Sequence, residues 1–309
     1  MAKNGVPDIC VKWFRGFLCG RQQRVKIGKS VFSSWQSVNG GVPQGTLSGP
    51  EIFLHMVSDL HTEVKDTKYV DDTTLVEVCT HGEDSQMQLA LDEICQWCDK
   101  NQLYLNASKT KEMLINFSRT EPNVPLLSIN GETIERVTEA KLLGVVLSSD
   151  LKWTSHVDYI HKKAVKRIHF IRQLKRSGVN TADLCRVYCS IVRPVMEYSC
   201  QTWCTSLTQE MTDLLESVQR RVCRILLPGE SYNEAMESLC LEPLESRRVN
   251  MCKVLFIQMQ NSKHRLHYLL PKERESKYNL RTANKYPLVK CRTNRYKNSF
   301  VPWCLFNLQ

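Results

Sequence analysis

The 309-residue sequence has no apolar run of about 18 residues, the length that a transmembrane helix needs. Its first residues, MAKNGVPDIC, lack the apolar core of a secretory signal peptide. Its 14 cysteines are scattered without the spacing of a disulfide framework, and no internal repeat is present. These absences argue against membrane-spanning, disulfide-rich secreted and repeat proteins, so we expect reduced thiols in a nuclear or cytoplasmic protein. The Cys95–Cys98 pair lies in a helical pattern without further ligands, which gives little support to zinc.

Positive charge is concentrated in the second half of the chain. Residues 1–150 contain 15 Lys and Arg against 19 Asp and Glu, whereas residues 151–309 contain 27 against 13. A surface with that excess suits a polyanion such as nucleic acid. A basic face that binds only solvent explains the same composition, so charge alone leaves both interpretations open.

The apolar spacing predicts an α+β chain, in which strands and helices alternate up to about residue 150 and helices follow. In the first half, helices are expected at 8–19, 53–64 and 84–101, the last with Asp84 as its cap. The segment 140–147, AKLLGVVL, is expected to form one strand. In the second half, the i, i+3, i+4 pattern predicts amphipathic helices at 153–176, 184–191 and 211–225.

The stretch KYVDDTTLVEV, at 68–78, is typical of a strand, a tight turn and a second strand, with two adjacent aspartates at the tip. Aspartate is common in turns, and this preference explains most such pairs. Two carboxylates on a rigid hairpin also suit a metal ion, because Mg²⁺ prefers hard oxygen ligands. The hairpin by itself leaves both interpretations open.

A glycine-rich segment, VNGGVPQGTLSGPEIF at 38–53, precedes this hairpin and opens a helix. Pro50 suits the first helical turn, where its missing N–H costs nothing. The glycines either shape a strand-to-helix turn or let a ligand approach the backbone closely. After the hairpin, LNASKTKEML at 105–114 forms a turn that carries lysines.

These segments, in this order and spacing, resemble successive motifs of a reverse transcriptase palm, of the kind found in non-LTR retrotransposons. The PQG at 43–45 and the YVDD at 69–72 carry the resemblance, and LNASKTKEML resembles the next motif. KLLGVVLSSDLKW, at 141–153, resembles the segment that leads into the thumb. Three later stretches resemble the carboxyl-terminal region of such polyproteins: IVRPVMEYSCQTW, LLESVQRRVCRIL and RTNRYKNSFVPW. The resemblance covers nearly the whole chain.

The resemblance implies an incomplete polymerase palm, an antiparallel sheet with helices, over residues 1–135. It implies a palm–thumb connection and thumb helix over 136–180, and a helical, basic carboxyl-terminal region over 181–309. The implied reaction adds a nucleotide to a primer 3′ hydroxyl, with an RNA template, a DNA primer and deoxynucleoside triphosphates. Two Mg²⁺ (or Mn²⁺) ions would stabilise the attacking and leaving oxygens.

The resemblance also implies roles for single residues. Asp71 would be the principal metal ligand and a catalytic carboxylate, and Asp72 an auxiliary one. Contacts with the nucleotide, the template or the primer end are implied for Pro43, Gln44, Gly45, Tyr69 and Val70.

Two lysines, Lys109 and Lys111, occupy the place where the family has a lysine near the triphosphate. Either one would neutralise or protonate the leaving pyrophosphate, and the sequence leaves the choice between them open. One face of the 153–176 helix would grip the nucleic-acid backbone, through Lys162, Lys163, Lys166 and Arg167.

One catalytic carboxylate of the family is missing from the expected place, a strand before PQG. Residues 1–39 contain a single acidic residue, Asp8, in a helical context. Two closely spaced ions repel each other, so Asp71 and Asp72 would hold them poorly without a bridging carboxylate. We therefore expect a carboxyl-terminal fragment of a reverse transcriptase that is inactive alone. The alternatives are a non-catalytic remnant that binds nucleic acid, and a decayed element without any role.

Overall fold

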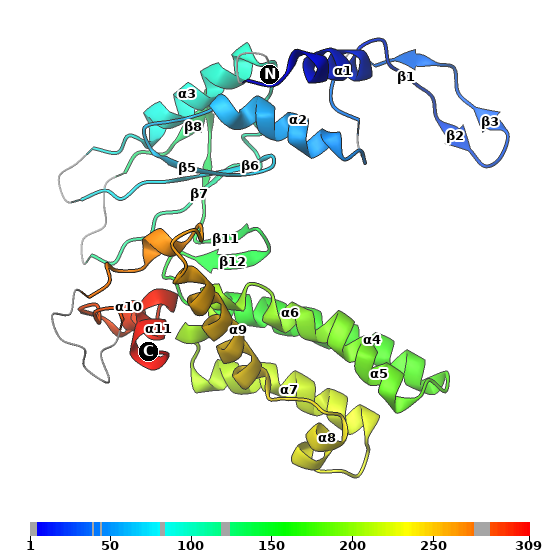
Figure 1. The fold of residues 1–309 in the computed structure, drawn as a ribbon, viewed down its shortest axis with the longest axis vertical. Coiled ribbons are helices and arrows are strands. Elements are labelled where there is room, and N and C mark those ends of the chain that lie inside the picture. The colour runs from blue at the N-terminus through cyan, green and yellow to red at the C-terminus, as the bar shows by residue number, and fades with distance from the viewer. Residues whose placement is uncertain (1–4, 39, 44, 81–83, 119–123, 275–284) are drawn as a thin grey trace. The chain divides into compact units, whose positions relative to one another are not determined.

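The computed structural model describes residues 5–38, 40–43, 45–80, 84–118, 124–274 and 285–309. The chain divides into two compact units (Figure 1). The first consists of Met1–Glu112 with Pro122–Arg136, and the second of Met113–Glu121 with Val137–Gln309. Each unit buries its own set of apolar side chains.

The first unit combines helices with short strand pairs. Its helices are α1 (Asp8–Leu18), α2 (Ser48–Met56), the 3₁₀ helix η2 (Val57–Asp59) and α3 (Met87–Lys100). Its strands are β1 (Gln22–Gln23), β2 (Lys26–Ile27), β3 (Val31–Phe32), β4 (Gln36–Ser37), β5 (Lys65–Tyr69), β6 (Asp72–Val76), β7 (Lys111–Glu112), β8 (Ser128–Ile129), β9 (Glu132–Thr133) and β10 (Glu135–Arg136). Within the described residues they form two-stranded sheets: β1–β4, β2–β3, β5–β6 and β8–β9 are antiparallel, and β10–β7 is parallel.

Helix α3 contributes a large part of the core of the first unit. Its apolar side chains recur at helical spacing and are buried: Leu91, Ile94, Cys95 and Cys98. They pack against the β8–β9 hairpin and against Leu75 of β6, so α3 supports one face of the β5–β6 hairpin. Burial raises the pKa of both cysteine thiols, as expected for small apolar core residues.

The predicted cap of α3 is wrong, because the helix begins at Met87 and Gln86 occupies the N-cap position without a side-chain cap hydrogen bond. Glu77 accepts hydrogen bonds from Ser85 Oγ (2.6 Å) and from the backbone N–H of Gln86 (2.8 Å). Asp84 therefore lies outside the helix, which begins three residues later than predicted. Local spacing gave no sign of this carboxylate, which comes from a different element.

The second unit is mainly helical, as the sequence predicts. In the described part of this unit one strand pair is present, and it is antiparallel: β11 (Glu139–Leu142) and β12 (Val145–Ser148). Its helical elements are α4 (Thr154–Arg176), α5 (Thr181–Val187), the π-helical turn η3 (Tyr188–Val192), α6 (Arg193–Glu197), η4 (Cys200–Thr202), η5 (Cys204–Ser206), α7 (Gln209–Leu226), α8 (Tyr232–Ser238), α9 (Leu244–Met259), η6 (His267–Leu269), α10 (Asn294–Lys297) and α11 (Phe300–Asn307). The α+β class is thus confirmed, with small sheets and a helical carboxyl-terminal half.

The prediction of one strand at 140–147 is wrong. The chain reverses at Leu143 and Gly144, whose φ angles are 46° and 89°. Two consecutive residues with positive φ are typical of a type I′ turn, which joins two antiparallel strands tightly. Leu143 extends the apolar run across the turn, and this hides the reversal in the sequence.

Helix α4 is the central helix of the second unit. It buries a stripe at three- and four-residue spacing: Val157, Ile160, Ala164, Ile168 and Ile171. The helix stops at Gly178, whose φ is 83°. There the N–H groups of Gly178 and Val179 bond back to Lys175 and Leu174, which caps the helix end. Each buried valine or isoleucine of the stripe contributes about 1.5–3 kcal/mol to folding.

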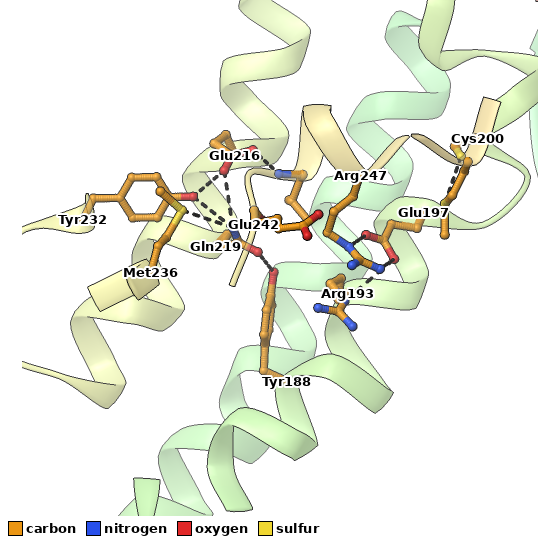
Figure 2. A network of polar contacts seen from close by, with 12 residues as sticks. Tyr188, Arg193, Glu197, Cys200, Glu216, Gln219, Tyr232, Met236, Glu242 and Arg247 are labelled. Atoms are coloured by element: carbon orange, nitrogen blue, oxygen red, sulfur yellow. Dashed lines mark hydrogen bonds and ion pairs between the residues drawn. The ribbon is translucent and has the colours of Figure 1, made fainter. Parts of the chain in front are cut away.

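A buried polar network ties the helices of the second unit together (Figure 2). Glu216 of α7 accepts hydrogen bonds from the Tyr232 hydroxyl and from the N–H of Leu244 (3.0 Å). Gln219, one turn further, accepts from the Tyr188 hydroxyl at 2.6 Å. Because every partner comes from a different element, the network fixes how η3, α8 and α9 pack on α7.

No helix in the described part of the chain combines the length and the apolarity that a bilayer crossing requires.

Candidate functional site

The two aspartates lie at the end of a regular five-residue hairpin. Strands β5 and β6 are paired from Lys65 with Val76 to Tyr69 with Asp72, so Val70 and Asp71 form the turn. Both carboxylate-bearing residues are exposed, as are Tyr69 and Val70. The predicted strand, turn and strand are confirmed, and Asp72 is the first residue of the second strand.

Val70 has an unusual backbone conformation beside the aspartates. Its φ angle is 57°, in the left-handed region that β-branched residues rarely adopt. Strained backbone of this kind gathers at functional sites, where the surrounding structure holds it in place. Glycine or asparagine would be the most stable residue at a turn position with this positive φ.

Lys68 holds the base of the turn, although the sequence reading assigned it no role. Its ammonium donates hydrogen bonds to the carbonyl oxygens of Val57 (3.3 Å) and Leu60, and forms an ion pair with Asp66 at 3.3 Å. These bonds connect the hairpin to the segment after α2. Both the hairpin and the segment after α2 therefore set the position of the two aspartates. In the sequence, the role of Lys68 is indicated only by strand alternation, which puts its side chain on the opposite face from the exposed Tyr69.

The glycine-rich segment forms a tight turn before α2. Thr46 Oγ1 donates a hydrogen bond to the carbonyl of Pro43 at 2.9 Å. A Cβ at Gly49 would lie 3.3 Å from that same carbonyl, so this glycine has a structural role. Gly45 differs, because its φ is 78° while a Cβ there would meet no atom within 4 Å. Space for an approaching ligand thus exists at Gly45; Gln44 lies outside the described residues.

The two candidate lysines have different surroundings. The ammonium of Lys111 forms an ion pair with Glu135 and donates to the carbonyl of Ser108 at 3.2 Å. Lys109 is exposed, and its ammonium has no partner among the residues that the structure describes. Asn106 Oδ1 accepts the backbone N–H of Lys109 at 3.1 Å and thereby orders the turn. Of the two ammonium groups, that of Lys109 is the one without an ion-pair partner in the described part of the chain.

Asp71 and Asp72 are the candidate metal ligands of the hairpin. Among the described residues, His, Cys, Asp and Glu side chains do not gather in a group of three or more that could hold a metal ion. The chemistry of this pair, two exposed carboxylates, fits a hard cation such as Mg²⁺. The pair alone supplies few of the six oxygen ligands that Mg²⁺ prefers.

The basic face of α4 lies in the second unit. Lys162, Lys163 and Lys166 are exposed, as a phosphate-binding role requires. Arg167 is half-buried and donates a hydrogen bond to the carbonyl of Ile191, so part of its capacity is used within the unit.

A small pocket adjoins this face, between α4, α6 and the β11–β12 turn. It has a volume of about 210 Å³, and two lysines line it, Lys141 and Lys163. Lys141 donates a hydrogen bond to the Tyr159 hydroxyl at 2.8 Å, and together with the charge of Lys163 this lowers the pKa of that phenol. The Tyr198 ring closes the pocket against Gly144. Sequence reasoning missed Lys141, because its partner Tyr159 lies 18 residues away on another element.

Comparison with known proteins finds a family match for the first part of the chain. Residues 2–147 match the family described as reverse transcriptase (RNA-dependent DNA polymerase). The chain is 24% identical over 241 residues to a probable RNA-directed DNA polymerase from transposon X-element of Drosophila melanogaster, a match covering 74% of this chain and 26% of that relative. It is 25% identical over 185 residues to the RNA-directed DNA polymerase from mobile element jockey of Drosophila funebris, covering 55% and 20%. The chain therefore spans about a quarter or less of these relatives. No solved structure matches it.

Proposed function

We propose, from the match of residues 2–147 to the reverse transcriptase family, that this chain is part of an RNA-directed DNA polymerase of a non-LTR retrotransposon. In the assembled enzyme it helps to transfer a nucleotide to a primer 3′ hydroxyl on an RNA template. The β5–β6 hairpin carries the proposal, because its turn exposes Asp71 and Asp72 beside the strained Val70.

The two aspartates hold Mg²⁺ or Mn²⁺ in this proposal, with Asp71 as principal ligand and Asp72 as auxiliary. When bound, the ions stabilise negative charge on the attacking and leaving oxygens. The bonds from Lys68 to the segment after α2 keep the hairpin, and so the carboxylates, in one position. Tyr69 and Val70 pack beside the primer end.

Residues on the neighbouring turns bind the nucleotide and the template. Pro43, Gln44 and Gly45 lie against the template and the incoming nucleotide, where the open space at Gly45 admits a ligand. Lys109, rather than the paired Lys111, neutralises the leaving pyrophosphate.

The proposal divides the chain as the family resemblance implies. Residues 1–135 form a partial palm, 136–180 a palm–thumb connection with the thumb helix, and 181–309 a basic carboxyl-terminal region. The exposed lysines of α4 then contact phosphates without reading sequence, which suits a thumb.

We propose further that the 309-residue chain does not extend a primer by itself. Two ions about 3.5–4 Å apart repel each other, and a pair of carboxylates offsets little of that repulsion. A third carboxylate from outside the described residues would complete the site.

Primer extension on an RNA template tests this proposal, with the purified chain and with Mg²⁺ or Mn²⁺. We expect no extension above background. Robust template-dependent synthesis that Asp71→Ala abolishes would overturn the proposed inactivity while supporting the polymerase assignment.

Binding of Mn²⁺, followed by electron paramagnetic resonance, tests the metal site without any need for catalysis. We expect weak binding that the double variant Asp71→Asn/Asp72→Asn removes. Glu132→Gln is the matched control, since Glu132 is also an exposed acid on a short hairpin of the same unit. Equal Mn²⁺ binding by all three proteins would contradict the assigned ligands.

A second candidate function is nucleic-acid binding without catalysis, which the exposed lysines of α4 favour. Binding should then fall steeply with salt, because phosphate contacts release counterions. It should be unchanged in Asp71→Ala, and weakened in the triple variant Lys162→Gln/Lys163→Gln/Lys166→Gln.

A further inference from the structure

A second basic surface lies far from α4 in the sequence, on the ribbon formed by residues 22–37 (Figure 1). In this ribbon β1 pairs with β4 and β2 with β3, and the chain reverses near Gly28, whose φ is 64°. All eight strand residues are exposed. Both faces of the ribbon are therefore exposed to solvent. This is unusual, because two strands that pack against nothing else are only marginally stable.

One face of the ribbon combines cations with aromatic rings. Lys26 is directly opposite Phe32 in the register, and its ammonium lies 5.5 Å from the centre of that ring. The Arg24 guanidinium lies 4.0 Å from the Phe32 ring and 4.6 Å from the Trp35 ring. Both rings remain accessible, since Phe32 is 42% and Trp35 56% exposed.

The cations of this face are not neutralised by acidic neighbours. Arg24 and Lys26 take part in no ion pair among the described residues. Residues 1–38 contain seven Lys and Arg against one acidic residue, whereas residues 39–150 contain eight against 18. The positive charge of the first half is thus gathered in the segment that holds the ribbon. Stacking on rings also leaves guanidinium N–H groups free to donate to phosphate.

The opposite face of the ribbon is aliphatic. It carries Val25, Ile27 and Val31, which are exposed by 63%, 68% and 61%. Successive side chains of a strand point to opposite sides, so these residues lie on the same strands as the cations but on the other face.

We propose that the face formed by Arg24, Lys26, Phe32 and Trp35 binds single-stranded nucleic acid. The cations contact phosphates, and the two rings stack on unpaired bases, the combination that non-specific single-strand sites use. A duplex offers its phosphates but not its base faces, so the accessible rings favour a single strand. This site goes beyond the proposed polymerase function and needs neither metal nor catalysis.

Fluorescence anisotropy with labelled oligothymidylate of about 16 nucleotides, and with a duplex of the same length, tests the proposal on the full chain. Phe32→Ala/Trp35→Ala should weaken single-strand binding roughly tenfold or more, given the usual effect of losing a stacked ring. Phe32→Leu/Trp35→Leu keeps apolar bulk and should lose a similar amount. Arg24→Gln should lower the slope of log affinity against log salt by about 0.7.

Val25→Ala/Val31→Ala is the matched control, because it truncates exposed side chains on the same strands. It should bind within about twofold of the unchanged chain, since it removes no stacked ring. The proposal is overturned if the aromatic variants bind as tightly as the unchanged chain, or if the aliphatic control loses as much. An equal loss for the duplex would refute the assignment to single strands. None of these outcomes depends on whether the chain extends a primer.

Discussion

The buried imidazole of His156 makes the second unit sensitive to acid. His156 lies on α4 and is 1% exposed; its Nδ1 accepts the N–H of Val146 on β12 at 3.2 Å. Its Nε2 has no hydrogen-bond partner among the described residues, and the ring of Trp203 lies 5.3 Å away. Burial lowers the pKa of His156 from 6.5 to about 4, because the charged form loses its hydration.

The sign and the size of the effect follow from this shift. The unfolded chain binds the proton near pH 6.5 and the folded chain near pH 4, so acid favours the unfolded state. The contribution of His156 to stability is complete above pH 6.5. It falls by about 1.4 kcal/mol per pH unit toward pH 4, a loss of about 3 kcal/mol in total.

Urea unfolding at pH 7 and pH 5, followed by circular dichroism, checks this prediction. The free energy of unfolding should be about 2 kcal/mol lower at pH 5 through His156 alone. His156→Asn keeps an acceptor for the N–H of Val146 but does not titrate, so it isolates the effect. If the variant loses as much stability between the two pH values as the unchanged chain, the reasoning is refuted.

Two further substitutions test the packing of the second unit by chemical denaturation. Gly144→Ala should lower the free energy of unfolding by more than the 1–2 kcal/mol usual for a left-handed backbone, because its Cβ would lie 3.2 Å from the Tyr198 ring. Gly178→Ala has the same positive φ with open space around it, and equal losses in the two variants would contradict a role for that contact. Glu216→Ala leaves buried donors without an acceptor and should cost about 3 kcal/mol. Glu210→Ala, exposed on the same helix, should cost less than about 1 kcal/mol, and an equal loss would argue against the network.

Local patterns predict the fold where a single element determines it. For helix α4 the sequence indicates both the apolar stripe and the end of the helix, since Gly178, with its positive φ, comes soon after the stripe. The pattern fails where a distant side chain or a backbone angle decides. Glu77 accepts a hydrogen bond from Gln86, just before α3, although it comes from another element. Leu143 turns the chain although its side chain suits a strand.

In the candidate site, too, local features are predictable from the sequence and contacts between distant residues are not. The order of PQG and YVDD places Asp71 and Asp72 on a hairpin, and the structure has that hairpin. The sequence contains no sign that Lys68 bonds to two backbone carbonyls, or that Glu135 engages Lys111 but not Lys109. Such pairings depend on tertiary register, which residue order alone does not determine.

The distribution of charge connects the proposed sites. Residues 39–150, which contain Asp71 and Asp72, carry 18 acidic residues against eight basic ones. When no metal cation is bound, this segment therefore repels a polyanion. The excess positive charge lies on either side of it, in residues 1–38 and 151–309. A nucleic acid would therefore gain affinity from the flanking segments, while the acidic segment is suited to hold divalent metal. Affinity and metal-dependent chemistry would then depend on different residues, and substitutions can separate them.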